Sequence, residues 1–293
     1  LMQSEALESP SPWQQPVVPE VRYAITPDGL RIAHYAIGSG NVDVSYVPGW
    51  VSNIETMWEH ELPAKFLSGI ASLSRLICFD KRGTGLSDRV PVDQLPNLET
   101  RIEDVCAVLD AVGSERPVLL GVSEGGPMAA AFVAEHPERS SGLILYGSYA
   151  ARKPSPGYPW APSPEARSRW LNFLEREWGG EVDLRTLAPS MQNEPAFRRY
   201  WSRYLRSGAS PSAAVALGRM NTEIDIRNIV ESIQTPTLVL HRTGDLDTPV
   251  EGARWLAENI PDANLVELEG TDHLPQIRSE QILESIRSFL GRL

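Results

Sequence analysis

The stretch LLGVSEGGPMAAAF, residues 119–132, places three glycines around a single serine, where an apolar run meets an alanine-rich one. Glycine weakens both strands and helices, so its use here indicates a backbone shape that other residues rarely adopt. The apolar run favours a buried strand and the alanine-rich run favours a helix. We therefore predict a tight strand-to-helix turn at Ser123, with the hydroxyl at the helix N-terminus, where free N–H groups favour negative charge.

Gly121, Ser123 and Gly125 also form a G-x-S-x-G pattern. By itself this pattern is weak, but its position between a strand and a helix is the context in which such a serine acts as a nucleophile. A serine hydroxyl becomes a good nucleophile only when a base removes its proton, and that base is usually a histidine oriented by a carboxylate. We therefore predict that Ser123 is a nucleophile and expect a histidine and an acid at the same edge of the sheet.

Strands and helices alternate along most of the chain. Apolar runs predict strands at VRYAIT, LRIAHYAI, VDVSYV, SRLICFD, RPVLLGV, SGLILYG, TPTLVLH and ANLVELE. The first two flank the turn signal Pro27-Asp28-Gly29 and predict a hairpin. Helical spacing predicts helices near 56–72, 102–112, 124–136, 250–260 and 282–290. This order implies an α/β fold with a mostly parallel sheet of about eight strands, covered by helices on both faces.

Two segments depart from this alternation. Residues 151–222 have no strand pattern, several short helical stretches and many aromatic residues, and they are too long for a loop inside a compact domain. We interpret them as a helical cap inserted into a core formed by 20–150 and 223–293, with most of the aromatics packing the cap onto the core. Residues 1–19 are polar and proline-rich, so we predict a flexible N-terminal arm.

Composition and charge argue against several classes of function. The chain has 293 residues, 42% of them hydrophobic, which suffices for a sizeable core. Its formal charge of -11 disfavours binding to nucleic acid or to an anionic membrane surface. Apolar runs are shorter than the ~18 residues of a membrane helix, and the first residues lack the pattern of a signal peptide. We expect a cytoplasmic monomer or homodimer with no membrane span, cofactor or metal.

Cysteines are too few for a disulfide framework. Cys78 and Cys106 both fall in apolar patterns, so we expect them to be buried free thiols.

Five histidines are candidates for the base. His34, His60 and His136 lie in the hairpin or in and beside helices, and His241 ends a strand, so we expect these four to be structural. His273, in GTDHLPQ, follows the strand ANLVELE at its carboxyl end. In a parallel sheet this is the edge at which ligands bind, and it is also the edge that carries the serine turn. We therefore predict His273 as the base.

The acid has three candidates near that histidine. The loop HRTGDLDTP follows the preceding strand and offers Asp245 and Asp247, of which we favour Asp245. Asp272 adjoins His273, but neighbouring side chains in a loop usually diverge, so we rank it lower.

A tetrahedral intermediate also needs hydrogen-bond donors for its oxyanion. From position in the fold, we expect these to be the backbone N–H groups of Glu124, next to the nucleophile, and of Trp50, which follows Pro48-Gly49 after the strand VDVSYV. The Glu124 carboxylate would oppose an oxyanion if it faced the site. We therefore expect that carboxylate to point away and to be paired, with Arg82 as the candidate partner.

With these residues in place, the chain resembles the α/β-hydrolase superfamily from about residue 21 to its end. DKRGTGLSD, residues 80–88, is similar to the family's D-x-R-G-x-G-x-S motif, and LHRTGDLDTP and GTDHLP are similar to its acid and histidine loops. The chain order Ser, Asp, His is the family's order. The family's acid stands four residues before a proline, here Pro249, which again selects Asp245. Together with VPGW and GVSEGG, these motifs look most like a bacterial esterase-like subgroup related to hydrolase domains associated with class III nucleotide cyclases.

The resemblance implies a serine carboxylester hydrolase in which Ser123 attacks, His273 transfers protons and Asp245 orients the imidazole. The aromatic cap implies an apolar pocket for small to medium esters or lactones. A cofactor-free perhydrolase, a C–C bond hydrolase, and a hydrolase-like ligand receptor with little turnover remain alternatives. The chain departs from many relatives at Pro48, where they have His, and at Asp272, where they often have Gly.

Overall fold

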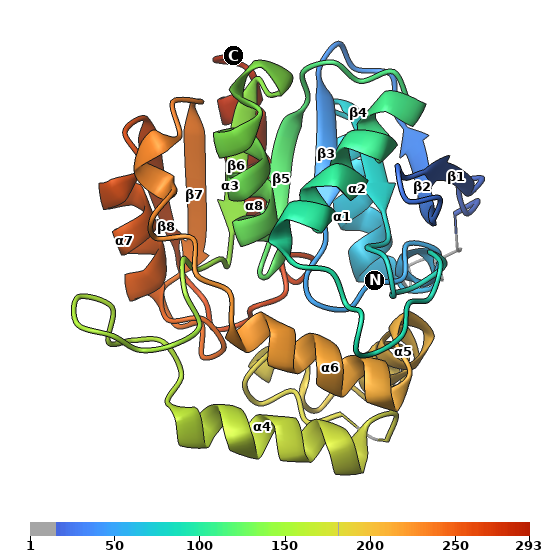
Figure 1. The fold of residues 1–293 in the computed structure, drawn as a ribbon, viewed down its shortest axis with the longest axis vertical. Helices are drawn as coiled ribbons and strands as arrows, with labels where there is room; N and C mark the ends of the chain where they lie inside the picture. The colour runs from blue at the N-terminus through green and yellow to red at the C-terminus, as the bar shows by residue number, and fades with distance from the viewer. Residues whose placement is uncertain (1–15, 181) are drawn as a thin grey trace, which may run out of the picture.

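The computed structural model describes residues 16–180 and 182–293, so most of the predicted arm lies outside the described residues. Within these ranges, eight strands form one sheet in the order β1-β2-β4-β3-β5-β6-β7-β8 (Figure 1). The pairs β1–β2 and β2–β4 are antiparallel, and every other neighbouring pair is parallel. The strands are β1 (Arg22–Ile25), β2 (Arg31–Ile37), β3 (Asp43–Val47), β4 (Arg75–Phe79), β5 (Val118–Val122), β6 (Gly142–Tyr146), β7 (Thr237–Arg242) and β8 (Ala263–Leu268). The predicted fold class is confirmed.

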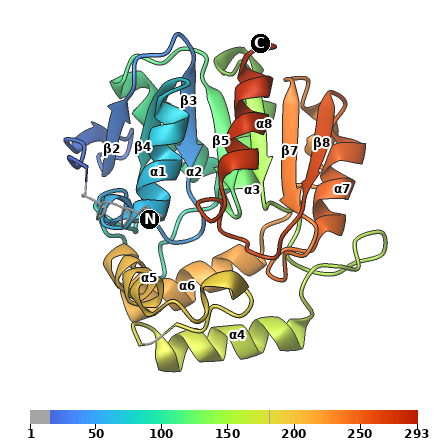
Figure 2. The same cartoon turned by 180° about the vertical axis from the view of Figure 1, so that it is seen from behind.

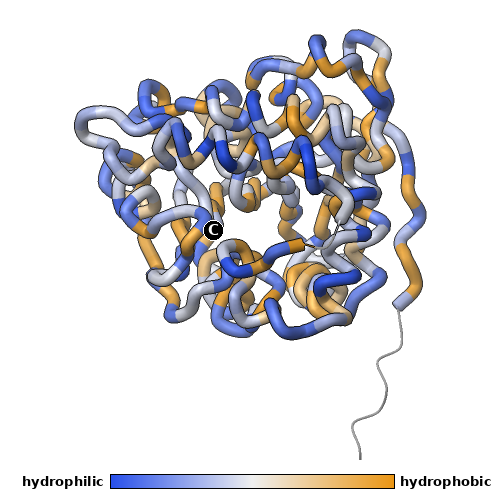
Figure 3. Tube along the Cα trace, turned by 90° about the horizontal axis from the view of Figure 1, so that it is seen from below, coloured by the Kyte–Doolittle hydropathy of each residue, from blue (hydrophilic) through white to orange (hydrophobic). Residues whose placement is uncertain are grey.

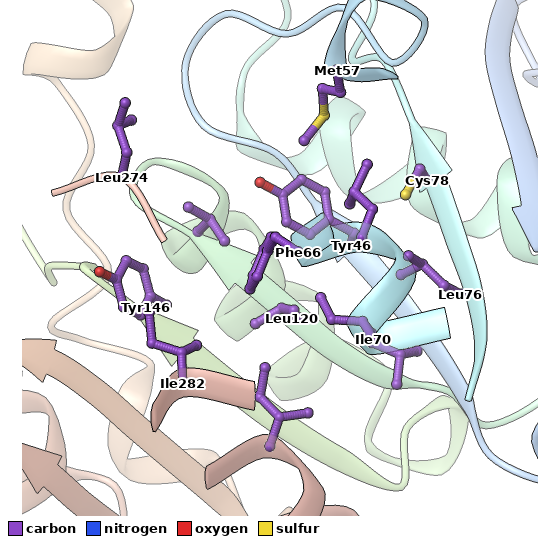
Figure 4. Close-up of a cluster of buried hydrophobic side chains, with 14 of the residues drawn as sticks. Tyr46, Met57, Phe66, Ile70, Leu76, Cys78, Leu120, Tyr146, Leu274 and Ile282 are labelled. Atoms are coloured by element: carbon purple, nitrogen blue, oxygen red, sulfur yellow. The ribbon is translucent and has the colours of Figure 1, made fainter. Parts of the chain in front are cut away.

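Helices cover both faces of this sheet. One face carries α2 (Leu98–Ala111), α3 (Gly125–Glu135) and α7 (Val250–Asn259), as Figure 1 shows. The opposite face carries α1 (Glu61–Ala71) and α8 (Glu280–Leu290), as Figure 2 shows. Each layer has its own apolar core, because the central parallel strands are buried on both sides. Figure 4 shows part of the core between the sheet and helices α1 and α8. In this core, Phe66, Ile70 and Ile282 from the helices lie near Tyr46 and Leu120 from the strands.

Local signals in the sequence explain where several elements end. Gly29 has φ +87 in the hairpin turn, and Gly113 has φ +63 directly after the last turn of α2, where glycine commonly ends a helix. The helix expected near 56–72 is divided. A short 3-10 helix, Thr56–Trp58, precedes α1, which starts only after His60, because the imidazole of His60 accepts a hydrogen bond from the N–H of Leu62 (3.2 Å).

Between β6 and β7 the chain forms three further helices, α4 (Pro164–Glu177), α5 (Pro195–Gly208) and α6 (Pro211–Thr222). Figures 1 and 2 show them together beyond one end of the strands. Figure 3 views the molecule from that side, where hydrophilic and hydrophobic stretches alternate along the chain. The buried rings of Tyr200, Trp201 and Tyr204 in α5 join the core beneath them. We term residues 151–222 the helical segment, and its role as a separate cap stays a prediction.

Asp80, which directly follows β4, holds two loops together by hydrogen bonds at the carboxyl ends of the parallel strands. Its buried carboxylate accepts hydrogen bonds from the Ser52 hydroxyl (2.7 Å) and from the N–H groups of Ile54 (3.0 Å) and Leu86 (2.9 Å). A Cβ at Gly85 would lie 2.0 Å from the carboxylate, so only glycine fits there. Burial raises the pKa of Asp80 to about 6 despite these hydrogen bonds. The D-x-R-G-x-G-x-S motif therefore serves the scaffold.

Cys78 is buried, as predicted, whereas Cys106 on α2 is only partly buried where it packs against the core; both thiols are free. Among the described residues, no helix is long and apolar enough to cross a membrane. In the same part of the chain, no cluster of His, Cys, Asp and Glu side chains could hold a metal ion.

Candidate active site

Ser123 occupies a strained turn between β5 and α3. Its φ of +53 lies in the left-handed region, which is uncommon for a residue other than glycine. The turn is fixed on both sides, since the Ser123 N–H donates to the carbonyl of Tyr146 (2.9 Å) and its own carbonyl accepts from the N–H of Gly126 (3.0 Å). Such strain costs ~1–3 kcal/mol and persists where the surroundings impose it, commonly at functional sites.

The glycines around Ser123 allow the close approach of other backbone. A Cβ at Gly121 would lie 2.6 Å from the carbonyl oxygen of Gly125, and a Cβ at Gly125 would lie 2.1 Å from the carbonyl oxygen of Val47. A Cβ at Gly126 would lie only 2.5 Å from Cβ of Ser148. The glycine pattern therefore reflects steric exclusion at the turn and at the packing of α3.

Asp245 and His273 form the hydrogen bond predicted for the acid and the base. Oδ2 of Asp245 lies 2.7 Å from Nδ1 of His273, and both side chains are buried. The carboxylate also accepts from the N–H groups of Asp247 (2.9 Å) and Thr248 (3.1 Å) and from the Thr248 hydroxyl (3.0 Å), which holds it in place. Gly147 leaves room for the imidazole, because a Cβ there would lie 3.0 Å from Cε1 of His273.

The two groups shift each other's pKa. Burial alone would lower the pKa of His273, but the charge of Asp245 and its hydrogen bond outweigh burial and raise that pKa. Burial would raise the pKa of Asp245, but the interactions with His273 lower it to about 2. Asp245 is therefore ionised at neutral pH.

Nε2 of His273 has no hydrogen-bond partner among the described residues, and His273 and Ser123 line the same cavity. The structure thus forms the acid–base bond but not a bond between the base and the serine. Hydrogen bonds of this kind often tighten only when substrate binds.

The other two acidic candidates lie elsewhere around His273. Oδ2 of Asp247 is 3.9 Å from Nε2, on the cavity side of the imidazole. Asp272 turns away toward the helical segment, where its carboxylate accepts from the N–H (2.9 Å) and the hydroxyl (2.8 Å) of Ser190. His241 is buried and contacts the carbonyl of Thr248, as expected for a structural residue. The contacts favour Asp245 as the acid.

The predicted oxyanion donors belong to the loop after β3 and to the residue that follows Ser123. Within residues 16–180 and 182–293, the backbone N–H groups of Trp50 and Glu124 have no hydrogen-bond acceptor. Gly49 brings the loop after β3 close to the serine, because a Cβ there would be 3.8 Å from Cβ of Ser123. The ring of Trp50 packs against Trp170, with the ring centroids 5.0 Å apart. Trp50 is therefore anchored by the helical segment while its N–H is available.

The Glu124 side chain is paired, as predicted, but the predicted partner was wrong. Its carboxylate accepts from Lys81 (2.8 Å), Arg101 (2.8 Å) and the amide of Asn221 (2.7 Å). Arg82 instead binds Asp104 of α2 and Asp28 of the hairpin turn. The residues lining the cavity do not include Glu124 within the described part of the chain.

Two cations keep Glu124 charged. Burial would raise the pKa of Glu124, but Lys81 and Arg101 lower it to about 2. Burial and the positive charge of Arg101 lower the pKa of Lys81 to about 8, although the Glu124 carboxylate raises it. The residue after Ser123 therefore belongs to a buried, ionised cluster with Lys81 and Arg101. Asn221 connects this cluster to α6 by a hydrogen bond.

Glu124→Gln should destabilise the protein strongly, because it leaves Lys81 and Arg101 buried without their carboxylate. Breaking a buried pair in this way typically costs ~3–5 kcal/mol, and we expect a loss in that range in denaturant unfolding. The matched control is Glu284→Gln, which removes an exposed contact to Arg287 and should cost no more than ~1 kcal/mol. Equal effects of the two variants would contradict this account.

A cavity of about 370 Å³ lies between the serine turn and the helical segment. Its walls are largely apolar and aromatic, and include Trp50, Trp170, Phe173, Trp178, Trp201 and Leu274. The polar lining includes Ser123, His273, Asp247, Arg152 and Asn221. Sequence reasoning missed Arg152 and Asn221. The only available signal for Arg152 was a charged residue soon after the β6 loop.

The sequence model of the alpha/beta hydrolase family matches residues 46–284. An AB hydrolase superfamily protein, YisY of Bacillus subtilis, is 27% identical over 254 residues, which cover 86% of this chain and 91% of that protein. A 2-hydroxymuconate semialdehyde hydrolase of Pseudomonas putida is 29% identical over 74% of this chain and 77% of that protein. Among solved structures, the esterase EaEST from Exiguobacterium antarcticum is similar, with a TM-score of 0.76 and 25% identity over 92% of this chain and 98% of that one.

Proposed function

The chain belongs to the alpha/beta hydrolase family, and on that premise we propose that it is a serine hydrolase that cleaves carboxylic esters or lactones. One observation carries the proposal: Ser123, in a left-handed turn, shares a cavity with His273, whose imidazole is bound to a buried, ionised Asp245. This arrangement supplies a nucleophile, a base and an orienting charge at one place. The similarity to an esterase of known structure agrees with this reaction class.

In the proposed mechanism, Oγ of Ser123 attacks the carbonyl carbon of the substrate while Nε2 of His273 takes the hydroxyl proton. The N–H groups of Trp50 and Glu124 stabilise the oxyanion that forms. The same imidazole returns the proton to the leaving alcohol as the C–O bond breaks, which leaves an acyl-enzyme. Water then attacks with His273 again as the base, and the carboxylic acid is released. Asp245 holds the imidazole in the required tautomer throughout.

The helical segment defines the substrate range in this proposal. Residues 151–222 act as a cap over the core, and the aromatic walls of the cavity favour apolar groups on small to medium substrates. Because Trp50 packs against Trp170 of α4, the cap also fixes the loop that supplies one oxyanion donor.

The proposal is tested with a panel of p-nitrophenyl esters and lactones, together with labelling by a fluorophosphonate mapped by mass spectrometry. We expect turnover of panel members and a single label on Ser123. Turnover with the label on another residue would contradict the assignment of the nucleophile.

A C–C bond hydrolase is the second candidate, and the similarity to a 2-hydroxymuconate semialdehyde hydrolase favours it. The same serine and histidine would serve a different bond. Labelling of Ser123 without turnover of any ester or lactone would move the proposal to this reaction.

The rate should depend on the protonation of His273, because only the neutral imidazole can accept the serine proton. Its pKa is raised, so kcat/KM should fall with decreasing pH through a value above 6.5. Asp245 and Asp247 raise this pKa and Arg152 lowers it, while burial lowers the pKa of nearby His241 and favours its neutral form. Asp247→Asn removes one of the raising charges, so the acidic limb should move to lower pH. A pH profile of kcat/KM on a neutral ester checks this, and a limb that moves upward would contradict it.

A further inference from the structure

Arg152 is a buried cation in the wall of the proposed active site. It follows β6 closely in sequence, is 7% exposed and lines the cavity. Its guanidinium lies over the ring of Tyr149, 4.3 Å from the centroid. The reaction described above gives this charge no role, and burying a charge is costly unless it is paired.

The polar contacts of Arg152 are long. Its nitrogens lie 3.3 Å from Oδ1 of Asn221, 3.3 Å from the carbonyl of Asp247 and 3.4 Å from Oδ2 of Asp247. Hydrogen bonds between a cation and a carboxylate are typically ~2.7–2.9 Å. Lys81 and Arg101 reach that range on Glu124, at 2.8 Å each. The guanidinium of Arg152 therefore has spare capacity for a closer anion.

A second buried arginine increases the local positive charge. Arg167 donates to neutral acceptors, namely Asn221, Thr222 and the carbonyl of Gly218. Burial and the charge of Arg152 lower the pKa of Arg167 to about 10. Asp247 is the one carboxylate in direct contact with either arginine among the described residues, and its side chain is 31% exposed.

This charge lies beside the proposed reacting groups. Asp247 approaches both Arg152 and His273, because its Oδ2 is 3.4 Å from the Arg152 guanidinium and 3.9 Å from Nε2 of His273. Arg152 is thus the one lysine or arginine among the described residues that line the cavity, and it lies in the same wall as the nucleophile and the base. The carboxylates in the lining are those of Asp247, Glu177 and Asp183.

We propose that Arg152 forms a subsite for a carboxylate, so that the physiological ester or lactone carries a carboxylate close to its scissile carbonyl. This inference rests on the proposed function and deepens it by naming a substrate class. Asp247 contacts the guanidinium at 3.3 and 3.4 Å, longer than a close ion pair. A substrate carboxylate would displace it and accept two parallel N–H bonds, for which a guanidinium is well shaped.

The test compares two matched substrates, the 4-nitrophenyl monoester of glutaric acid and the same ester with its free carboxylate replaced by a carboxamide. The wild-type protein should prefer the carboxylate. Arg152→Met should lower the ratio of the two kcat/KM values ~10- to 100-fold, the loss expected for hydrogen bonds to a charged group. Asp247→Asn should raise this ratio, because it removes the competing anion.

Arg167→Met is the matched control, since it removes a neighbouring buried charge that does not line the cavity within the described residues, and it should lower the ratio far less than Arg152→Met does. A wild-type protein without preference for the carboxylate would overturn the subsite. So would an Arg152→Met variant that loses both substrates equally, which would make Arg152 part of the scaffold. If Arg152→Met does not fold, the decision falls to Asp247→Asn, and an unchanged or lower ratio counts against the proposal.

Direct binding separates failure of the subsite from failure of the proposed function. Glutarate should bind to Ser123→Ala in calorimetry, and Ser123→Ala/Arg152→Lys should bind it more weakly, because an ammonium cannot make the paired contact. Glutarate binding without ester turnover would retain the subsite and reject the ester hydrolase. Turnover of the carboxamide ester alone, without glutarate binding, would retain the hydrolase and reject the subsite.

Discussion

Replacing Ser123 with alanine should lower ester turnover at least ~10³-fold, because the attacking oxygen is lost and only binding and oxyanion stabilisation remain. The variant should keep its fold. Alanine occupies the same left-handed turn as the serine, at φ +53, so the backbone strain is nearly unchanged. Steady-state hydrolysis of the best panel ester, together with the thermal unfolding midpoint, measures both effects.

The control for this variant is Ser285→Ala, which removes an exposed hydroxyl of α8 that bonds to the carbonyl of Gln281. It should retain wild-type turnover and react with the fluorophosphonate at Ser123. A folded Ser123→Ala protein with near-normal activity would reject the covalent mechanism, whatever the result with the control.

Asp245→Asn should have the second large effect, a loss of ~10³- to 10⁴-fold in kcat, the scale known for this change in serine hydrolases with this arrangement. The amide cannot stabilise the imidazolium, and it favours the wrong tautomer at the 2.7 Å contact with Nδ1 of His273. Asp247→Asn, two residues away in the same loop, is the matched control. It leaves that contact intact and should cost far less.

The kcat of each variant and the pH profile of its kcat/KM measure these effects. Asp245→Asn should also lower the pKa seen in the acidic limb, because the main charge that raises the pKa of His273 is gone. If Asp247→Asn lost more activity than Asp245→Asn, the orienting acid would have to be reassigned to Asp247.

Features set by short stretches of chain could be predicted from the sequence. Strand and helix positions follow from apolar periodicity, so the parallel sheet, its antiparallel start and the helices on both faces were predicted and are found. The turn at Ser123 follows from glycines within three residues, whose missing Cβ atoms the backbone requires. Placing Ser123, Asp245 and His273 at one edge needed only the rule that the carboxyl ends of parallel strands meet there.

Contacts between distant loops were decided only by the tertiary structure. From the sequence we expected Glu124 to pair with Arg82. Instead, the packing of α2 and α6 brings Arg101 and Asn221 to Glu124, and the loop after β4 contributes Lys81. Apart from its position soon after β6, nothing in the sequence marked Arg152 as a residue of the cavity, because its place there depends on how the helical segment folds. Side-chain direction in loops depends on packing with remote parts of the chain. Local patterns therefore determined the fold and the candidate nucleophile, base and acid, while tertiary packing decided the charges that surround them.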